Sequence, residues 1–140
     1  MDPQQTYLIR KTFAEVQRSQ HVAALVFYQR LFALDPSLQP MFRGDIEVQA
    51  QKLTDMLGVL ITMLERPEHL DAELRAMGAR HKEYGVKDAH YDTVGRALLD
   101  MLAGVLDKQW TPEVQAAWTA LYGVVGSAMK AGAAAAGVSD

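Results

Sequence analysis

Three polar side chains interrupt the apolar faces of otherwise amphipathic segments, at Tyr28, Gln49 and His81. A buried polar atom without a partner destabilises a fold by about 1–3 kcal/mol, so each of these groups needs a partner inside the protein. For each residue taken singly, a hydrogen bond to a neighbouring backbone carbonyl is a sufficient explanation. Chemically, however, the phenol and the amide are hydrogen-bond donors, and the imidazole is also a metal ligand.

His81 ends an apolar stripe formed by Leu70, Leu74 and Met77, just before Gly85. This spacing predicts an imidazole that points toward the core. The stripe has no second His, Asp or Glu three or four residues from His81, and the chain has no cysteine, so the pattern does not fit an ordinary zinc site. It does fit a single axial ligand to haem iron.

The composition predicts one globular domain over residues 1–140, because the chain is 49% hydrophobic and 22% charged. A net charge of -3 offers no basic patch, which argues against nucleic acid as a partner. The absence of cysteine excludes disulfides and fits a reducing compartment. Since the chain also has no export signal and no long apolar run, we expect no membrane span and a cytoplasmic location.

Apolar residues recur every three or four positions nearly throughout, which predicts an all-α chain. The expected helices cover residues 3–17, a segment from Ser19 or Gln20 to just before Asp35, residues 46–65, a segment ending before Gly85, residues 90–106, and a last helix opened by Thr111 and Pro112. A short turn of helix is expected over 36–42, Asp45 is expected to cap the long helix, and residues 131–140 are expected to form a flexible tail. Several further apolar residues are predicted to face the core: Tyr7, Ile9, Phe13, Val16, Val22, Leu25, Leu31 and Ile46.

Haem is a large apolar plate, and burying it requires apolar side chains on both sides. The long helix and the His81 helix, with the helix that follows, offer such a set: Leu53, Leu57, Leu74, Met77, Leu98 and Met101.

The order of these elements resembles a globin, in particular a single-domain bacterial haemoglobin related to the haem domain of flavohaemoglobins. The resemblance covers about residues 3–130. It rests on several short motifs: Phe27-Tyr28, Asp35-Pro36 with Phe42 six residues after the proline, Gln49 with Leu53, the run from Arg80 to Val86, and His90-Tyr91. It implies an all-α globin fold, a three-over-three helical sandwich around one haem b.

The resemblance also implies roles for individual residues. His81 would be the proximal iron ligand, Phe42 would pack on the haem face, and Tyr91 would lie near the proximal histidine. Tyr28 and Gln49 would be the polar pair on the distal side, where Leu53 would line the pocket. Leu57, Met77 and Leu98 complete the expected haem contacts.

Two distal donors predict tight and slowly reversible binding of dioxygen, and weaker sensitivity of carbon monoxide to the same groups. Nitric oxide is the third expected ligand, and dioxygenation of nitric oxide to nitrate is the leading expected activity. The sequence departs from flavohaemoglobins in two ways: no acidic residue lies between Glu113 and Asp140, and no Gly-x-Gly-x-x-Gly motif offers a nucleotide site. A catalytic cycle would therefore need an external reductase.

Other functions stay open at this point. A haem-based gas sensor would need an output module, and the Ala/Gly-rich tail is the nearest feature to one. A helical interaction protein without haem would use Tyr28, Gln49 and His81 as ordinary core polar residues. The sequence is compatible with a monomer or a weak homodimer.

Overall fold

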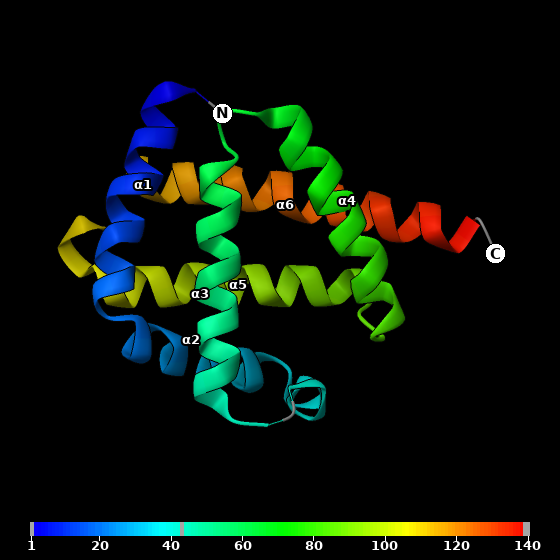
Figure 1. Cartoon of the computed structure of the whole chain (residues 1–140). Helices are drawn as coiled ribbons and strands as arrows, with labels where there is room; N and C mark the ends of the chain where they lie inside the picture. Colours follow the sequence, from blue (N-terminus) through cyan, green and yellow to red (C-terminus); the bar gives the residue numbers. More distant parts are fainter. Residues whose placement is uncertain (1, 43, 139–140) are drawn as a thin grey trace.

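The regular structure of the described chain is helical throughout (Figure 1). The computed structural model describes residues 2–42 and 44–138. Its elements are α1 (Pro3–Arg18), α2 (Gln20–Leu34), the 3-10 helix η1 (Pro36–Met41), α3 (Ile46–Thr62), α4 (Pro67–Glu83), α5 (Asp88–Leu106), the 3-10 helix η2 (Asp107–Gln109) and α6 (Pro112–Val138). The all-α prediction is confirmed.

The helix ends follow local sequence chemistry. Asp35 is extended and accepts a hydrogen bond from the Ser37 N–H, which ends α2 and opens η1. The Asp45 carboxylate accepts from the Glu47 N–H at 2.9 Å, so the predicted cap of α3 is confirmed. The helices α4 and α6 each begin with a proline in the first turn, where no N–H is needed.

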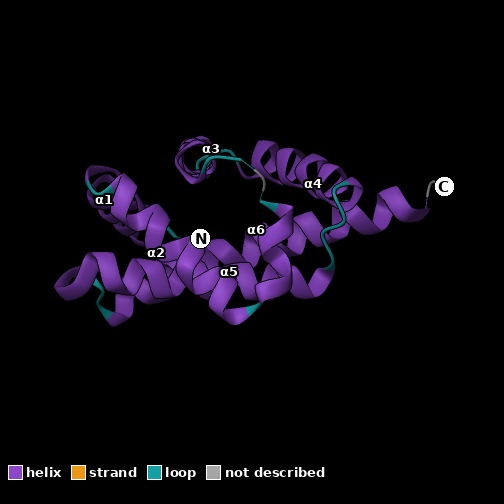
Figure 2. Ribbon diagram, turned by 90° about the horizontal axis from the view of Figure 1, so that it is seen from below, coloured by secondary structure: helices purple, strands orange, loops and turns teal. Residues whose placement is uncertain are grey.

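The helices form two layers, which separate clearly when the molecule is seen from below (Figure 2). One layer holds α1, α3 and α4, and the other holds α2, α5 and α6. Within the second layer α2 and α6 both pack on α5, while α1 and α4 cross over α6 and α3 packs on α2. This arrangement is the predicted three-over-three sandwich.

Buried side chains gather in two clusters. The larger one joins α1, α2, α3, α5 and α6, and the smaller one lies where α4 meets α6 and the carboxyl end of α3. Trp118 of α6 is completely buried in the larger cluster, and its indole N–H donates to the Thr12 hydroxyl at 2.9 Å. Because Thr12 in turn donates to the Leu8 carbonyl, the polar atoms of this contact are paired.

The prediction of a core position is wrong for four residues, because each of them is at least 39% exposed: Tyr7, Val22, Leu25 and Ile46. In α2 the buried side is the one with Ala23, Ala24, Phe27, Tyr28 and Leu31. Val22 and Leu25 stand on the opposite side, where no helix covers them. Apolar spacing indicated a helix here but did not indicate which of its sides is covered.

The segment expected to form a flexible tail is helical through Val138. The helix α6 continues without a break through Val138, with Gly132 and Ala133 buried. Contact of this segment with α4 explains why an Ala/Gly-rich sequence stays helical there. Ser139 and Asp140, which belonged to the same prediction, lie outside the described residues. Over the described ranges, none of the helices has the length and apolar character needed to cross a membrane.

Candidate functional site

His81 lies in the last turn of α4 with its side chain partly buried. Its Nδ1 atom is 2.7 Å from the backbone oxygen of Met77, one turn earlier in the same helix. A carbonyl oxygen can only accept a hydrogen bond, so Nδ1 carries the proton of the neutral ring and Nε2 keeps its lone pair. Proteins orient metal-binding histidines with this kind of bond to the second nitrogen. The ring thus has the tautomer of a metal ligand.

Backbone hydrogen bonds and a glycine turn fix the chain just after His81. The backbone oxygen of His81 accepts hydrogen bonds from the N–H groups of Tyr84 and Val86. Gly85 takes a φ of +89°, which side chains with a Cβ rarely adopt, and so ends the helix. The break predicted at Gly85 is confirmed, and it fixes the position of His81 at the end of α4.

Tyr28 lies at the centre of an aromatic cluster built from α2 and the segment after it. Its ring packs edge-on against Phe27 and Phe42, with centroids 5.0 and 5.4 Å apart, and lies nearly parallel to Phe32 at 5.9 Å. Phe42 also contacts Phe32, so the residue that follows η1 is tied to α2 by two rings. Tyr28 and Phe42, separate in sequence, therefore belong to one site.

These apolar surroundings set the protonation state of Tyr28. Its side chain is 4% exposed, and burial raises the pKa of its hydroxyl from 10.0 to about 12. The hydroxyl is therefore neutral at any physiological pH. A neutral phenol keeps its proton and can donate it in a hydrogen bond.

The other predicted distal residues follow one another along α3. Gln49 and Leu53 are partly buried, and Leu57 is buried, at the i, i+4 and i+8 positions of one face. Leu53 and Leu57 pack in the larger apolar cluster, which also contains Tyr28 and Leu98. Since α3 packs on α2, the structure brings the predicted distal set to one side of the molecule.

The predicted proximal residues gather in the smaller cluster. Met77, whose carbonyl orients His81, packs there with Leu74 and Tyr91. Leu60, near the carboxyl end of α3, belongs to the same cluster, so α3 contributes to both sets. Leu98 and Met101 of α5, which were also expected to bury the haem, lie in the larger cluster instead.

The two predicted sets lie mainly in different apolar clusters. Among the described residues, α3 packs mainly on α2 and α4 mainly on α6, and the backbones of α3 and α4 are not closely paired. His81 presents a nitrogen with a free lone pair, and Phe42 and Leu53 keep part of their apolar surface uncovered. No group of three or more His, Asp or Glu side chains in residues 2–42 and 44–138 could hold a bare metal ion. A single imidazole with apolar neighbours suits haem iron.

Comparison with known families agrees with this geometry. Residues 25–129 match the globin family. The chain belongs to the globin family. Two similar proteins are both named anaerobic nitrite reductase NSHB5, one from Oryza sativa subsp. indica and one from Oryza sativa subsp. japonica. Each is 26% identical over 132 residues, which cover 90% of this chain and 91% of the relative. Globins bind haem and, through it, small gases.

Next to the residues predicted to be proximal lies a tyrosine pair, of which the sequence analysis named only Tyr91. Tyr122 of α6 donates its hydroxyl proton to the backbone oxygen of Tyr91, and burial raises the pKa of the Tyr122 hydroxyl above its ordinary value. The Tyr122 ring lies so close to Gly95 that a Cβ there would stand 2.8 Å from its Cδ2 atom. The Tyr91 hydroxyl is buried without a hydrogen-bond partner in the described part of the chain.

That unpaired hydroxyl is a second observation in favour of a haem-binding role. Tyr91 shares its cluster with Met77, the residue that orients His81. A buried hydroxyl without a partner is costly, and such groups concentrate where function requires them. The predicted role of Tyr91 near the proximal histidine stays a prediction, because its hydroxyl has no contact with His81 among the hydrogen bonds described.

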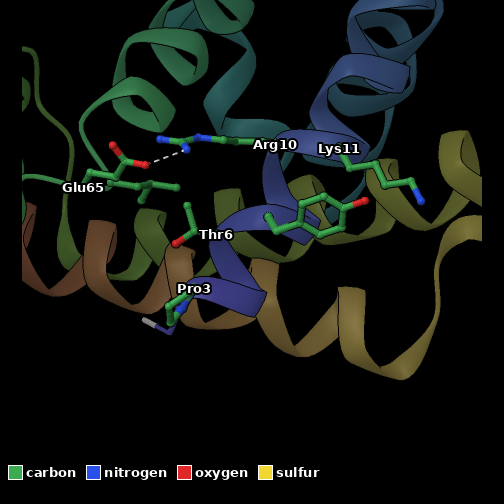
Figure 3. Close-up of a pocket in the computed structure, with 7 residues that line it drawn as sticks. Pro3, Thr6, Arg10, Lys11 and Glu65 are labelled. Carbon is green, nitrogen blue, oxygen red and sulfur yellow. Dashed lines mark hydrogen bonds and ion pairs between the residues drawn. The ribbon is translucent and has the colours of Figure 1, made fainter.

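A surface groove of about 630 Å³ lies away from this site, between α1 and the residues that follow α3 (Figure 3). Arg10 spans it and pairs with Glu65 at 2.9 Å, and Tyr7 and Lys11 are among its lining residues. None of the predicted site residues lines this groove. Both members of the ion pair are exposed, so the pair contributes little to stability.

The raised pKa of Tyr28 predicts a specific loss of stability at high pH. The folded chain holds this phenol neutral, so its contribution to stability is complete below pH 10 and is lost as the pH rises through about 12. In Tyr28→Phe the free energy of unfolding should fall less steeply above pH 10, by about 1 kcal/mol per pH unit. Urea unfolding at several pH values measures this slope. Equal slopes in the two proteins would contradict the buried, neutral state of Tyr28.

Proposed function

We propose that this globin holds one haem b through Nε2 of His81 and binds dioxygen reversibly with high affinity. The observation that carries the proposal is the hydrogen bond from His81 Nδ1 to the Met77 carbonyl, which leaves Nε2 as the only ring nitrogen able to ligate a metal. Phe42, Leu53, Leu57, Met77 and Leu98 would supply apolar contacts to the porphyrin. Carbon monoxide and nitric oxide would bind at the same position.

When bound, the haem supplies a ferrous iron at which a diatomic gas binds reversibly and which can give up one electron. The chain supplies the polar groups around that gas. Tyr28 keeps its hydroxyl proton because its surroundings are apolar, so it can donate to a ligand that carries negative charge. Such a bond contributes about 1.5–3 kcal/mol, which is roughly a tenfold to hundredfold change in the dissociation constant. Gln49 would be the second donor, from α3.

Tight binding suits chemistry on the gas better than its delivery. We propose nitric oxide dioxygenation, in which nitric oxide, dioxygen and one electron give nitrate. A reductase that binds a nucleotide cofactor would supply the electron, and residues 1–140 contain no Gly-x-Gly-x-x-Gly motif for such a cofactor. The cysteine-free composition favours a cytoplasmic setting for this reaction.

A second activity is suggested by the relatives named anaerobic nitrite reductase, which align with 90% of the chain. In that reaction nitrite, one electron and two protons give nitric oxide and water. The two activities share the electron donor but require opposite oxygen conditions, so one preparation can test both.

The haem assignment predicts an absorption spectrum. The purified or haemin-reconstituted chain should show a strong Soret band that shifts on reduction and again with carbon monoxide. In His81→Gly the band should weaken or change shape, and free imidazole should restore it, because the added ring replaces the missing ligand. His69→Gly is the matched control, since His69 is exposed. A protein that folds but remains colourless with haemin would refute the assignment.

The distal assignment predicts slower dioxygen release with Tyr28 than without it. Tyr28→Phe should speed dioxygen dissociation by about tenfold or more and change carbon monoxide dissociation less. Gln49→Leu should have a similar effect if the amide donates directly. Stopped-flow displacement of dioxygen by carbon monoxide gives the rates, with Tyr7→Phe as the control because Tyr7 is 56% exposed. An unchanged rate in Tyr28→Phe would exclude it as the donor.

The reaction itself can be measured in a single turnover. Mixing the oxygenated ferrous protein with nitric oxide should give one nitrate per haem and leave the haem ferric. The same ferrous protein, kept without oxygen and mixed with nitrite, should release nitric oxide only if the second activity is present. If no nitrate forms, nitric oxide dioxygenation is refuted, and only the proposed gas binding remains.

A further inference from the structure

The helix α4, which carries His81, packs closely against α6 at Gly78 and Gly132. A Cβ added to Gly78 of α4 would stand 2.6 Å from the backbone carbon of Met129 in α6, and closer still to its oxygen. A Cβ added to Gly132 of α6 would stand 2.6 Å from the backbone carbon of Arg75 in α4. Both obstacles are backbone, which cannot rotate away as a side chain can. The two helices therefore touch backbone to backbone.

One of these contacts falls on the peptide that orients the imidazole. The oxygen that accepts the hydrogen bond from His81 Nδ1 belongs to Met77, and the same peptide group continues into the nitrogen of Gly78. Peptide groups are planar and rigid, so the position of Gly78 determines the position and direction of that oxygen. Any displacement of Gly78 away from α6 moves the acceptor of the His81 hydrogen bond.

A backbone obstacle distinguishes Gly78 and Gly132 from the other described glycines, since at Gly95 the obstacle is the Tyr122 side chain. Gly104 in α5 and Gly123 in α6 would meet nothing within 4 Å if each gained a Cβ. Glycine inside a helix costs about 1 kcal/mol relative to alanine, so a glycine at a crossing needs a packing reason. At Gly78 and Gly132 the reason is the close approach of α4 and α6.

We infer that Gly78 and Gly132 are positioning residues for His81, which hold the Met77–Gly78 peptide at a fixed distance from α6 and thereby set the direction and strength of the hydrogen bond to Nδ1. This inference rests on the proposed function for its consequence at iron. A stronger bond to Nδ1 makes the imidazole a better electron donor through Nε2. The crossing of α4 and α6 therefore sets how strongly His81 binds the metal.

The test compares glycine-to-alanine variants by the state of the His81 ring. In Gly78→Ala the helices must separate, and the His81 Nδ1 proton should show an upfield NMR shift and faster exchange with water, because its hydrogen bond lengthens. In the ferrous, ligand-free protein, the iron–histidine stretching band should move to lower frequency. Gly132→Ala should give smaller changes of the same sign, because its contact at Arg75 is two residues from Met77.

Gly123→Ala and Gly104→Ala are the matched controls, since they make the same chemical change at positions with open space. Both should leave the His81 proton and the iron–histidine band at their wild-type positions. If Gly78→Ala does not fold, Gly132→Ala still tests the inference. Loss of stability with an unmoved Nδ1 proton and an unmoved band would overturn it, because the glycines would then serve packing alone.

The same experiment distinguishes a failure of this inference from a failure of the proposed haem ligation. A wild-type chain without a band that depends on His81 would refute haem ligation, and the Nδ1 proton would still show whether the glycines position the ring. A wild-type band that is present but identical in all four variants would keep the proposed function and overturn the positioning role.

Discussion

The hydrogen bond between His81 Nδ1 and the Met77 carbonyl is the constraint on which the rest of the site depends. It selects one tautomer, directs Nε2 away from the helix that carries the ring, and ties the imidazole to a rigid peptide. Neighbouring features of the structure keep that peptide in place. Gly85 ends α4 just beyond the ring, the smaller apolar cluster buries Met77, and α6 lies against Gly78. The geometry of this hydrogen bond, which lies within one turn of helix, is thus fixed by tertiary packing.

The two sides of the site are built by different physical means. On the proximal side a polar bond and a close backbone contact fix one nitrogen. On the predicted distal side packing dominates: three phenylalanine rings pack against Tyr28, and their low polarity keeps its hydroxyl protonated. Tyr28, the proposed distal donor, keeps its proton because it has few polar neighbours, whereas His81, the proposed proximal ligand, keeps a free nitrogen because it has one well-placed partner.

Much of this fold can be read from the sequence because helix ends are locally encoded. Asp35, Asp45, Thr111 and Pro112 mark ends that the structure confirms to within a residue or two, and the stripe ending at His81 correctly placed that residue at the end of α4. The burial of Tyr28 also agrees with its predicted place on an apolar face, whereas the packing of Phe42 against it was not predicted.

What the sequence could not reveal depends on which helices meet. Val22 and Leu25 have the spacing of core residues, but whether a helical face is covered is decided by distant segments. At the carboxyl end of the chain the sequence misled in the other direction. An Ala/Gly-rich stretch taken by itself predicts a weak helix, although α6 continues through it. Only the contact of Gly132 with α4 shows why the helix continues there. Likewise, Gly78 has no special local pattern, and its importance follows from the backbone of α6.

The contact between α4 and α6 also limits how this protein can change by mutation. Each backbone already touches the other, so neither glycine can be compensated by a smaller residue opposite it. Every substitution at Gly78 or Gly132 adds volume, and added volume can only push the helices apart. Mutations at this crossing can therefore only increase the distance between the two helices. A lineage that loses one glycine could regain the original spacing only by restoring that same residue.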